Sequence, residues 1–248
     1  MIIKSIWLRR IHKWVGLIIG VQFLLWAISG TAMALLNMEE VAGGERAELS
    51  TPSFPATPGA WPRIQQALAG QPVTKVSLQP LPWGQHLLVT SAGGGSSLFN
   101  AATGLPVQIG EHEARLIAAS AHPQRAAVAR VAPLTEVTLA VREHQLPIWQ
   151  IDFRDEQHSS YYVSGSTGVI LERRNDTWRW WNLFWMLHNM DYAERTSFNH
   201  PLIVTVGIAM AWLAVTGFWL LFRTMWRHDL RWAKLTWRRA DAHRGRSA

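Results

Sequence analysis

The chain has 248 residues, with 24 Lys and Arg against 17 Asp and Glu, and no cysteine. The absence of cysteine excludes disulfides, thiolate metal sites, thiol catalysis and the Cys-x-x-Cys-His type of haem attachment. The excess positive charge lies only at the two ends. Segment 1–13 holds four basic groups and segment 223–248 holds eight, whereas segment 37–200 holds twelve basic and fifteen acidic groups. This distribution fits the positive-inside rule of membrane proteins, so no nucleic-acid partner is expected.

A first transmembrane helix is predicted in segment 1–38, after a basic cytoplasmic N-terminus. No charged side chain occurs from Trp14 to Met38, a run of 25 residues. A helix of that length extends about 37 Å, enough to cross a hydrocarbon core of about 30 Å. The alternative is a signal peptide cleaved near Ala34, but the apolar run is about twice as long as the usual hydrophobic region of such peptides. We therefore expect a retained helix.

A polar segment at 39–60 contains Pro and Gly and has no periodicity, so it is predicted to be a flexible linker. Two similar units follow, at 61–110 and 111–176. Each is expected to begin with a short helix and to continue as a small antiparallel sheet, and 135–142 is taken as the first strand-like stretch of the second unit. One helix on one sheet, twice, is an α+β arrangement.

The evidence for a repeat is a shared turn. Aligning 100–104 with 164–168 gives an offset of 64 residues, and both stretches end in Thr-Gly between two β-rich runs. Gly104 and Gly168 are predicted to take the φ > 0 position of a hairpin turn. The alternative is a chance similarity between two hairpins.

The rest of the chain contains three segments. Segment 177–195 is rich in Trp, and its charge-free core is too short to span a bilayer, so an interfacial helix is predicted. Segment 196–222 is free of acidic and basic groups and is the second predicted transmembrane helix, followed by a basic cytoplasmic tail at 223–248. Both termini are then cytoplasmic, and the α+β domain lies on the periplasmic side of a bacterial inner membrane. Anionic lipid is the expected neighbour of the basic tail.

Several motifs together resemble the PepSY-associated transmembrane (PepSY-TM) family of bacterial inner-membrane proteins. The first helix carries His12-x-Trp14-x-Gly16 and later Ser29-Gly30, and the last carries Thr216-Gly217. The outer repeats are similar to PepSY units, and the second leads directly into the Trp-rich segment and Leu-His188-Asn-Met-Asp. Two departures stand out. The Asp of the family turn is Asn100 or Ser164 here, and many relatives have four spanning helices where this chain has two.

The resemblance implies a role in iron or siderophore metabolism, with b-type haem held by membrane histidines in some members. It therefore suggests a haem b electron-transfer component linked to ferric-siderophore reduction or to a respiratory complex. The alternative is a non-catalytic accessory or assembly subunit whose PepSY units bind a periplasmic protein. The sequence has no nucleophile elbow, P-loop, dinucleotide fingerprint or His-Glu-x-x-His motif, so no catalytic residues are predicted.

Depth in the membrane sorts the haem-ligand candidates, because two axial imidazoles must lie at one level. His12 and His228 are expected near the cytoplasmic boundary, and His188 and His200 near the outer one. The feasible pairs are therefore His12 with His228, His188 with His200, or the same histidine in two copies of the chain. The ordinary alternative is that these side chains only anchor the helices at the interface.

The remaining histidines are scattered over the outer domain without a ligand-like spacing, so they are predicted to be surface groups, and no metal other than haem iron is expected. Gly16 and Gly20 form a small-xxx-small pattern on the first helix that allows a close approach by another helix or a flat porphyrin. Gln22 is expected to face protein, because an unpaired amide in hydrocarbon is costly. A homodimer or a hetero-oligomer with another membrane protein is expected.

Overall fold

The structure is a computed structural model that describes residues 5–44, 60–192 and 201–244, with side chains as far as Arg223. It divides into two units. One comprises Leu36–Asn182, and the other comprises Met1–Leu35 with Leu183–Ala248. The first is the extramembrane α+β domain, and the second holds both candidate membrane spans.

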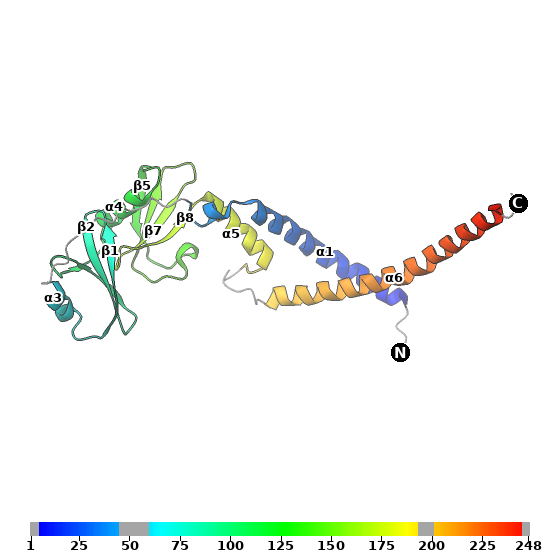
Figure 1. The fold of residues 1–248 in the computed structure, drawn as a ribbon, viewed down its shortest axis with the longest axis horizontal. Helices are drawn as coiled ribbons and strands as arrows, with labels where there is room; N and C mark the ends of the chain where they lie inside the picture. Colours follow the sequence, from blue (N-terminus) through cyan, green and yellow to red (C-terminus); the bar gives the residue numbers. More distant parts are fainter. Residues whose placement is uncertain (1–4, 45–59, 193–200, 245–248) are drawn as a thin grey trace. The chain divides into compact units, whose positions relative to one another are not determined.

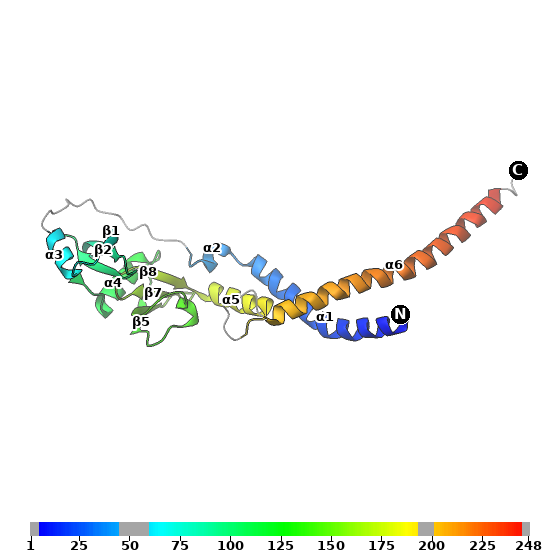
Figure 2. The ribbon, with the colours of Figure 1, turned by 90° about the horizontal axis from the view of Figure 1, so that it is seen from below.

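The membrane unit is built on two long helices, α1 (Ser5–Leu35) and α6 (Pro201–Arg244). Their apolar parts, Ile6–Leu35 and Pro201–Arg223, are long enough to cross a bilayer. The two helices lie side by side where they cross (Figures 1 and 2). They are antiparallel, because residues 12 and 16 of α1 meet residues 216 and 213 of α6 respectively. The helix α6 also continues through most of the segment that we predicted as a basic tail.

The extramembrane domain contains two successive helix-plus-sheet units, as predicted (Figure 1). Each sheet is antiparallel, and its four strands are neighbours in chain order. The first unit consists of α3 (Ala60–Ala67), β1 (Val73–Leu81), β2 (Gly84–Ser91), β3 (Ser96–Asn100) and β4 (Pro106–Val107). The second consists of α4 (Glu111–Ala121), β5 (Val128–Pro133), the 3-10 helix η1 (Leu139–Val141), β6 (Ile148–Phe153), β7 (Ser160–Ser164) and β8 (Ile170–Arg174).

The repeat extends to individual hydrogen bonds at the predicted offset. The Asn100 side-chain oxygen accepts bonds from the two backbone N–H groups at positions 102 and 103. The Ser164 hydroxyl accepts the equivalent bonds from positions 166 and 167. Gly104 and Gly168 follow with φ of 70° and 68°, as predicted. Asn and Ser therefore supply the acceptor that an Asp would supply, and the departure from the family turn does not change the turn.

The two helix-plus-sheet units of the extramembrane domain share one core. Leu81 and Leu98 of the first sheet belong to the same buried cluster as Ile117 of α4 and Ile151 of β6. Gly168 lies at the centre of this cluster, since a Cβ atom there would be 3.2 Å from the Leu81 side chain and 3.3 Å from that of Ile117. The domain is therefore held together by burial between the repeats as well as within each repeat.

The structure corrects the first strand of the second unit. That strand is β5, and the stretch 135–142 contains the 3-10 helix η1 instead. Ala140 and Val141 of η1 are buried with Ile148 and Tyr162. A short apolar run is compatible with either a strand or a helical turn. Here its burial against the sheet of the second unit decided the outcome.

The start of the segment that we predicted as a flexible linker forms a short helix instead. A four-residue helix, α2 (Met38–Val41), begins at Asn37, whose side-chain oxygen accepts a bond from the Glu39 N–H at 2.9 Å. The Glu40 carbonyl accepts a bond from the Asn175 side chain at 2.8 Å. This end of the segment is therefore attached to the domain, and 45–59 lies outside the described residues.

The helix α5 (Asp176–Asn189) forms within the Trp-rich segment. The Asn175 side chain accepts a bond from the Trp178 N–H, which satisfies one of the free donors at the start of the helix. The Arg174 guanidinium lies 4.4 Å above the Trp178 ring. The helix ends before Met190, whose φ of 54° is the left-handed conformation typical of a helix C-terminus.

We predict that Gly168→Ala lowers the free energy of unfolding of the extramembrane domain by about 2–5 kcal/mol. A side chain at φ > 0 costs about 1–2 kcal/mol, and overfilling a packed core costs about 1–3 kcal/mol. Two controls separate these effects. Gly70 has φ of 77° but open space around it, and Gly95 has neither constraint. Denaturant unfolding of the full chain in detergent should rank the Ala variants Gly168, Gly70, Gly95 from least to most stable.

Candidate functional site

The first predicted ligand, His12, lies on α1 at a polar contact with α6. Its ring nitrogen Nδ1 is 2.7 Å from the Thr216 hydroxyl oxygen. That hydroxyl donates its own proton to the Trp212 carbonyl at 2.8 Å. It therefore accepts from the imidazole, so Nδ1 carries the proton and Nε2 carries the lone pair.

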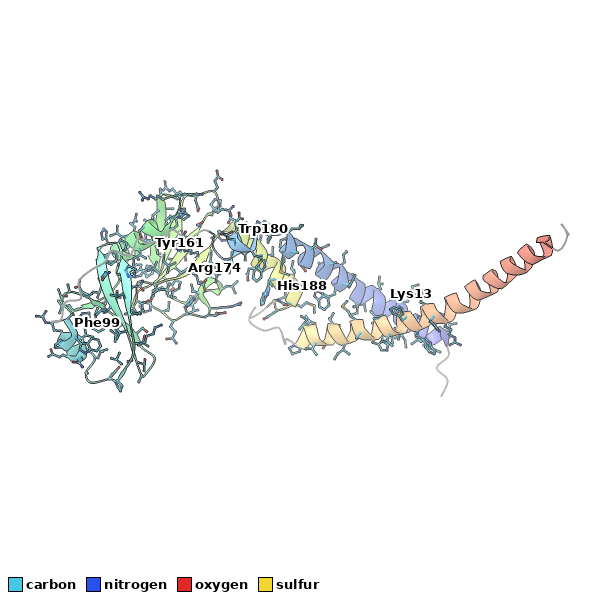
Figure 3. The ribbon with its side chains drawn as sticks, viewed as in Figure 1. Lys13, Phe99, Tyr161, Arg174, Trp180 and His188 are labelled. Carbon is cyan, nitrogen blue, oxygen red and sulfur yellow. The ribbon has the colours of Figure 1, made fainter. Side chains whose placement is uncertain are left out.

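A glycine makes room for this ring. A Cβ atom at Gly217 would lie 3.4 Å from Cε1 and 3.8 Å from Nε2 of His12. The Trp212 ring, one turn earlier on α6, is tilted against the imidazole with 6.4 Å between the centroids. Figure 3 labels Lys13, the residue after His12, at the crossing of α1 and α6. The Thr-Gly pair thus holds the ring: Thr216 bonds its Nδ1, and Gly217 lets it lie close to α6.

The second predicted ligand, His188, lies in the last turn of α5 and meets the other end of α1 (Figure 3). Its Nδ1 is 3.2 Å from the Ser29 hydroxyl oxygen. Ser29 donates to the Leu25 carbonyl at 2.6 Å and so accepts from the imidazole. A Cβ atom at Gly30 would lie 3.2 Å from Cε1 of His188, and the Trp26 ring is tilted against the imidazole at 6.0 Å.

The two sites have the same construction. In each, an imidazole donates through Nδ1 to a hydroxyl on another helix, and the hydroxyl residue is followed in sequence by glycine. A Trp on the helix that carries the hydroxyl flanks the ring. Ser29-Gly30 and Thr216-Gly217 carry part of the family resemblance, but the sequence alone did not connect them with the histidines. The signal was present, because a hydroxyl residue followed by glycine occurs once in each predicted span at the depth of a histidine on another segment.

The sites occupy two levels of the membrane unit. Ser29 is 17 residues beyond His12 on α1, which is about 25 Å along the helix axis. The two imidazoles therefore cannot bind one ligand together. Within the described residues neither Nε2 atom has a hydrogen-bond partner, and neither is among the buried polar atoms that lack one. In the described part of the chain, each imidazole thus bonds through Nδ1 alone.

The other two predicted ligands are not placed at these sites. His200 lies outside the described residues. The backbone of His228 belongs to α6, but its side chain is beyond the described part. It is twelve residues past Thr216, which corresponds to about 18 Å along the helix axis. A pairing of His12 with His228 in one chain would have to bridge more than three turns of α6.

The small residues of α1 face different surroundings. A Cβ atom at Gly16 would lie 3.8 Å from the Leu213 side chain, so Gly16 faces α6. A Cβ atom at Gly20 would have no neighbour within 4 Å in the described residues. Between the two histidine sites, the Gln22 amide nitrogen and the Trp26 ring nitrogen are buried without a hydrogen-bond partner in that part of the chain. Gln22 does face protein, as predicted.

Two outer-domain histidines contradict the prediction that all of them are surface groups. His86 and His122 are 1% and 4% exposed. Burial lowers the pKa of His86, although its bond to the Gly84 carbonyl acts in the opposite direction. His122 lies 3.2 Å from Asp155. Burial acts to raise the pKa of Asp155, but bonds from Ser159 and His122 outweigh it and lower that pKa. These are structural hydrogen bonds, and no cluster of three metal-ligating side chains occurs among the described residues.

Comparison with known proteins identifies the family. The sequence profile of the PepSY-associated TM region matches residues 9–246. The chain belongs to this family. No curated protein and no solved structure matches the chain. As a PepSY-TM protein with two candidate spans, it is a membrane protein with an extramembrane α+β domain.

The described sites of this PepSY-TM protein fit a haem group as far as one axial ligand each. Protein histidines that bind metals donate their second ring N–H to an acceptor, which fixes the tautomer and raises the basicity of the ligating nitrogen. Thr216 and Ser29 supply that acceptor at the two sites. Gly217 and Gly30 let each imidazole lie close to the neighbouring helix, which holds the ring in place.

We predict that the His12 to Thr216 hydrogen bond stabilises the contact between α1 and α6. A double-mutant cycle with His12→Ala and Thr216→Val should give a coupling energy of about 0.6 kcal/mol and at most about 1.7 kcal/mol, the range found for interhelical bonds in membranes. Unfolding in mixed detergent micelles measures it. Thr205→Val is the control, since that hydroxyl bonds the Pro201 carbonyl of its own helix. Zero coupling between His12 and Thr216 would contradict the contact.

Proposed function

We propose that this protein is a haem b-binding electron-transfer component of the bacterial inner membrane. The observation that carries the proposal is the shared state of two imidazoles. His12 and His188 are each fixed through Nδ1 by a hydroxyl on another helix, each ring has a glycine against it, and no described residue bonds either Nε2. An imidazole that only anchored a helix at the interface would not need a hydroxyl acceptor on another helix and a glycine beside it at both levels.

Each residue of the site has a separate role. The imidazoles of His12 and His188 would hold the haem iron, through Nε2. Thr216 and Ser29 hold the rings in one tautomer and one orientation. Gly217 and Gly30 provide space at the ring edges. When bound, haem supplies reversible one-electron transfer, and the lipid-facing apolar residues of α1 and α6 keep water from that site.

The resemblance to PepSY-TM proteins suggests the acceptor. It is a ferric siderophore in iron uptake or a partner in a respiratory complex, and the extramembrane domain is the part of this chain available to meet it. The orientation that follows from the charge distribution places both termini in the cytoplasm and this domain in the periplasm. Electrons then pass outward from a cytoplasmic or membrane donor.

The proposal predicts that protein purified in mild detergent from haem-replete cells is red, with a Soret band that shifts on reduction by dithionite. His12→Ala and His188→Ala should each lose the haem of their own level, about half of the absorbance, because the two imidazoles lie about 25 Å apart on the rise of α1. The matched control is His112→Ala, which changes an exposed histidine of α4.

Two results would count against this assignment. A colourless protein from haem-replete cells would eliminate the electron-transfer function. Full haem content in both His12→Ala and His188→Ala would leave the function standing and show that other residues bind the iron. Circular dichroism and size-exclusion profiles matching those of the parent protein are required of each variant.

The topology gives a separate prediction. A reporter enzyme that is active only in the periplasm should be active when fused after Gly59 and silent when fused after Arg227. The physical reason is that the twelve basic groups of segments 1–13 and 223–248 resist translocation. The opposite pattern would place the extramembrane domain in the cytoplasm.

A groove in the extramembrane domain favours the second candidate function, an accessory subunit that binds a periplasmic protein. It has a volume of about 450 Å³ and lies between the end of the first sheet and the start of β6, with Val107, Ile148 and Trp149 among its lining residues. None of the lining residues is charged. A colourless protein that co-purifies with a periplasmic partner, and loses it on Trp149→Ala, would establish this function instead.

A further inference from the structure

The described residues provide one imidazole at each level of the membrane unit. His12 stands at one level and His188 at the other, about 25 Å apart along α1. A six-coordinate haem that transfers electrons needs two axial ligands at one depth. The described part of one chain therefore supplies half of each ligand set.

The described residues supply no second partner at either half-site. Among them no hydrogen bond reaches the Nε2 of His12 or of His188. The two spans bury little of themselves, since only 6% of the apolar stretch of α1 and 11% of that of α6 is buried inside the chain. A lone pair facing hydrocarbon is unfavourable, so each Nε2 requires a further partner, and the exposed faces of the spans are available to another molecule.

We propose that a second copy of this chain completes both sites. The inference rests on the proposed haem function. A two-fold axis along the membrane normal relates each residue to a copy of itself at the same depth, so His12 meets the His12 of the partner copy and His188 meets its His188. Among the described residues of one chain, no second imidazole lies at either level.

The helices have the features that such a dimer requires. Two copies bring four spanning helices together, the usual number around a haem in a helical bundle. Gly20, midway between the two sites on α1, has no neighbour within 4 Å in the described residues and permits another backbone to approach. The dimer holds two haems, one at each level, or one haem per chain.

The test uses full-length chain carrying two different affinity tags, neither of them polyhistidine, co-expressed and purified over both matrices in turn. Native mass spectrometry and haem extraction should give two chains and two haems per particle. The ferric electron paramagnetic resonance spectrum should be low-spin at both levels.

A ligand swap in one copy tests the shared site directly. One tagged copy carries His12→Met and the other is unchanged. In a shared site every haem at that level has one imidazole and one thioether ligand, a spectrum found in neither homotypic preparation. In a site contained within one chain, the spectrum is the average of the two homotypic spectra. The control pair carries His112→Met in one copy and should match the unchanged protein.

The outcomes separate the dimer from the function. A monomer that holds six-coordinate haem, or an averaged spectrum in the mixed particle, overturns the dimer and leaves the haem function in place. A particle in which a different protein supplies the second ligand also overturns it. A colourless protein removes the function and the dimer with it. If His12→Met prevents insertion, Thr216→Val in one copy is used, with a changed low-spin signal at one level as the expected result.

Discussion

The membrane unit depends on how the ring nitrogens of its histidines find hydrogen-bond partners inside an apolar helix pair. Hydrocarbon offers no hydrogen bonds, so every imidazole must find its partners in protein or in a ligand. At both levels the Nδ1 side is satisfied by a hydroxyl on another helix. The Nε2 side is not satisfied within the described residues. This asymmetry fixes the tautomer and leaves the Nε2 lone pair for a further partner.

The extramembrane domain is stabilised in a different way. It has no disulfides, so its stability depends on burial. Two helix-plus-sheet units place Leu81, Ile117 and Ile151 in one cluster, and Gly168 keeps that cluster closely packed. The repeated turn starts with Asn100 in one unit and Ser164 in the other, yet the same backbone N–H groups are bonded. The acceptor geometry therefore constrains this position more than the residue type does.

Charge-free apolar runs were sufficient to predict the two spans, and the shared Thr-Gly turns were sufficient to predict the repeat and its offset of 64 residues, because both are visible in the sequence itself. The strand predicted at 135–142 was wrong, since a three-residue apolar run has no period and its burial against Ile148 depends on tertiary packing. The contacts of His12 with Thr216 and of His188 with Ser29 span 204 and 159 residues. No local pattern specifies such pairs, although depth in the membrane restricted which residues could meet.

The central claim is that histidine Nε2 atoms are the haem ligands on both faces of the iron. Near-infrared magnetic circular dichroism of the oxidised protein tests this directly, because the energy of its charge-transfer band identifies the axial ligand pair. The account predicts a band characteristic of two imidazoles for all the bound haem. A band from imidazole with thioether, imidazole with hydroxide or a five-coordinate iron in the unmodified protein would contradict it.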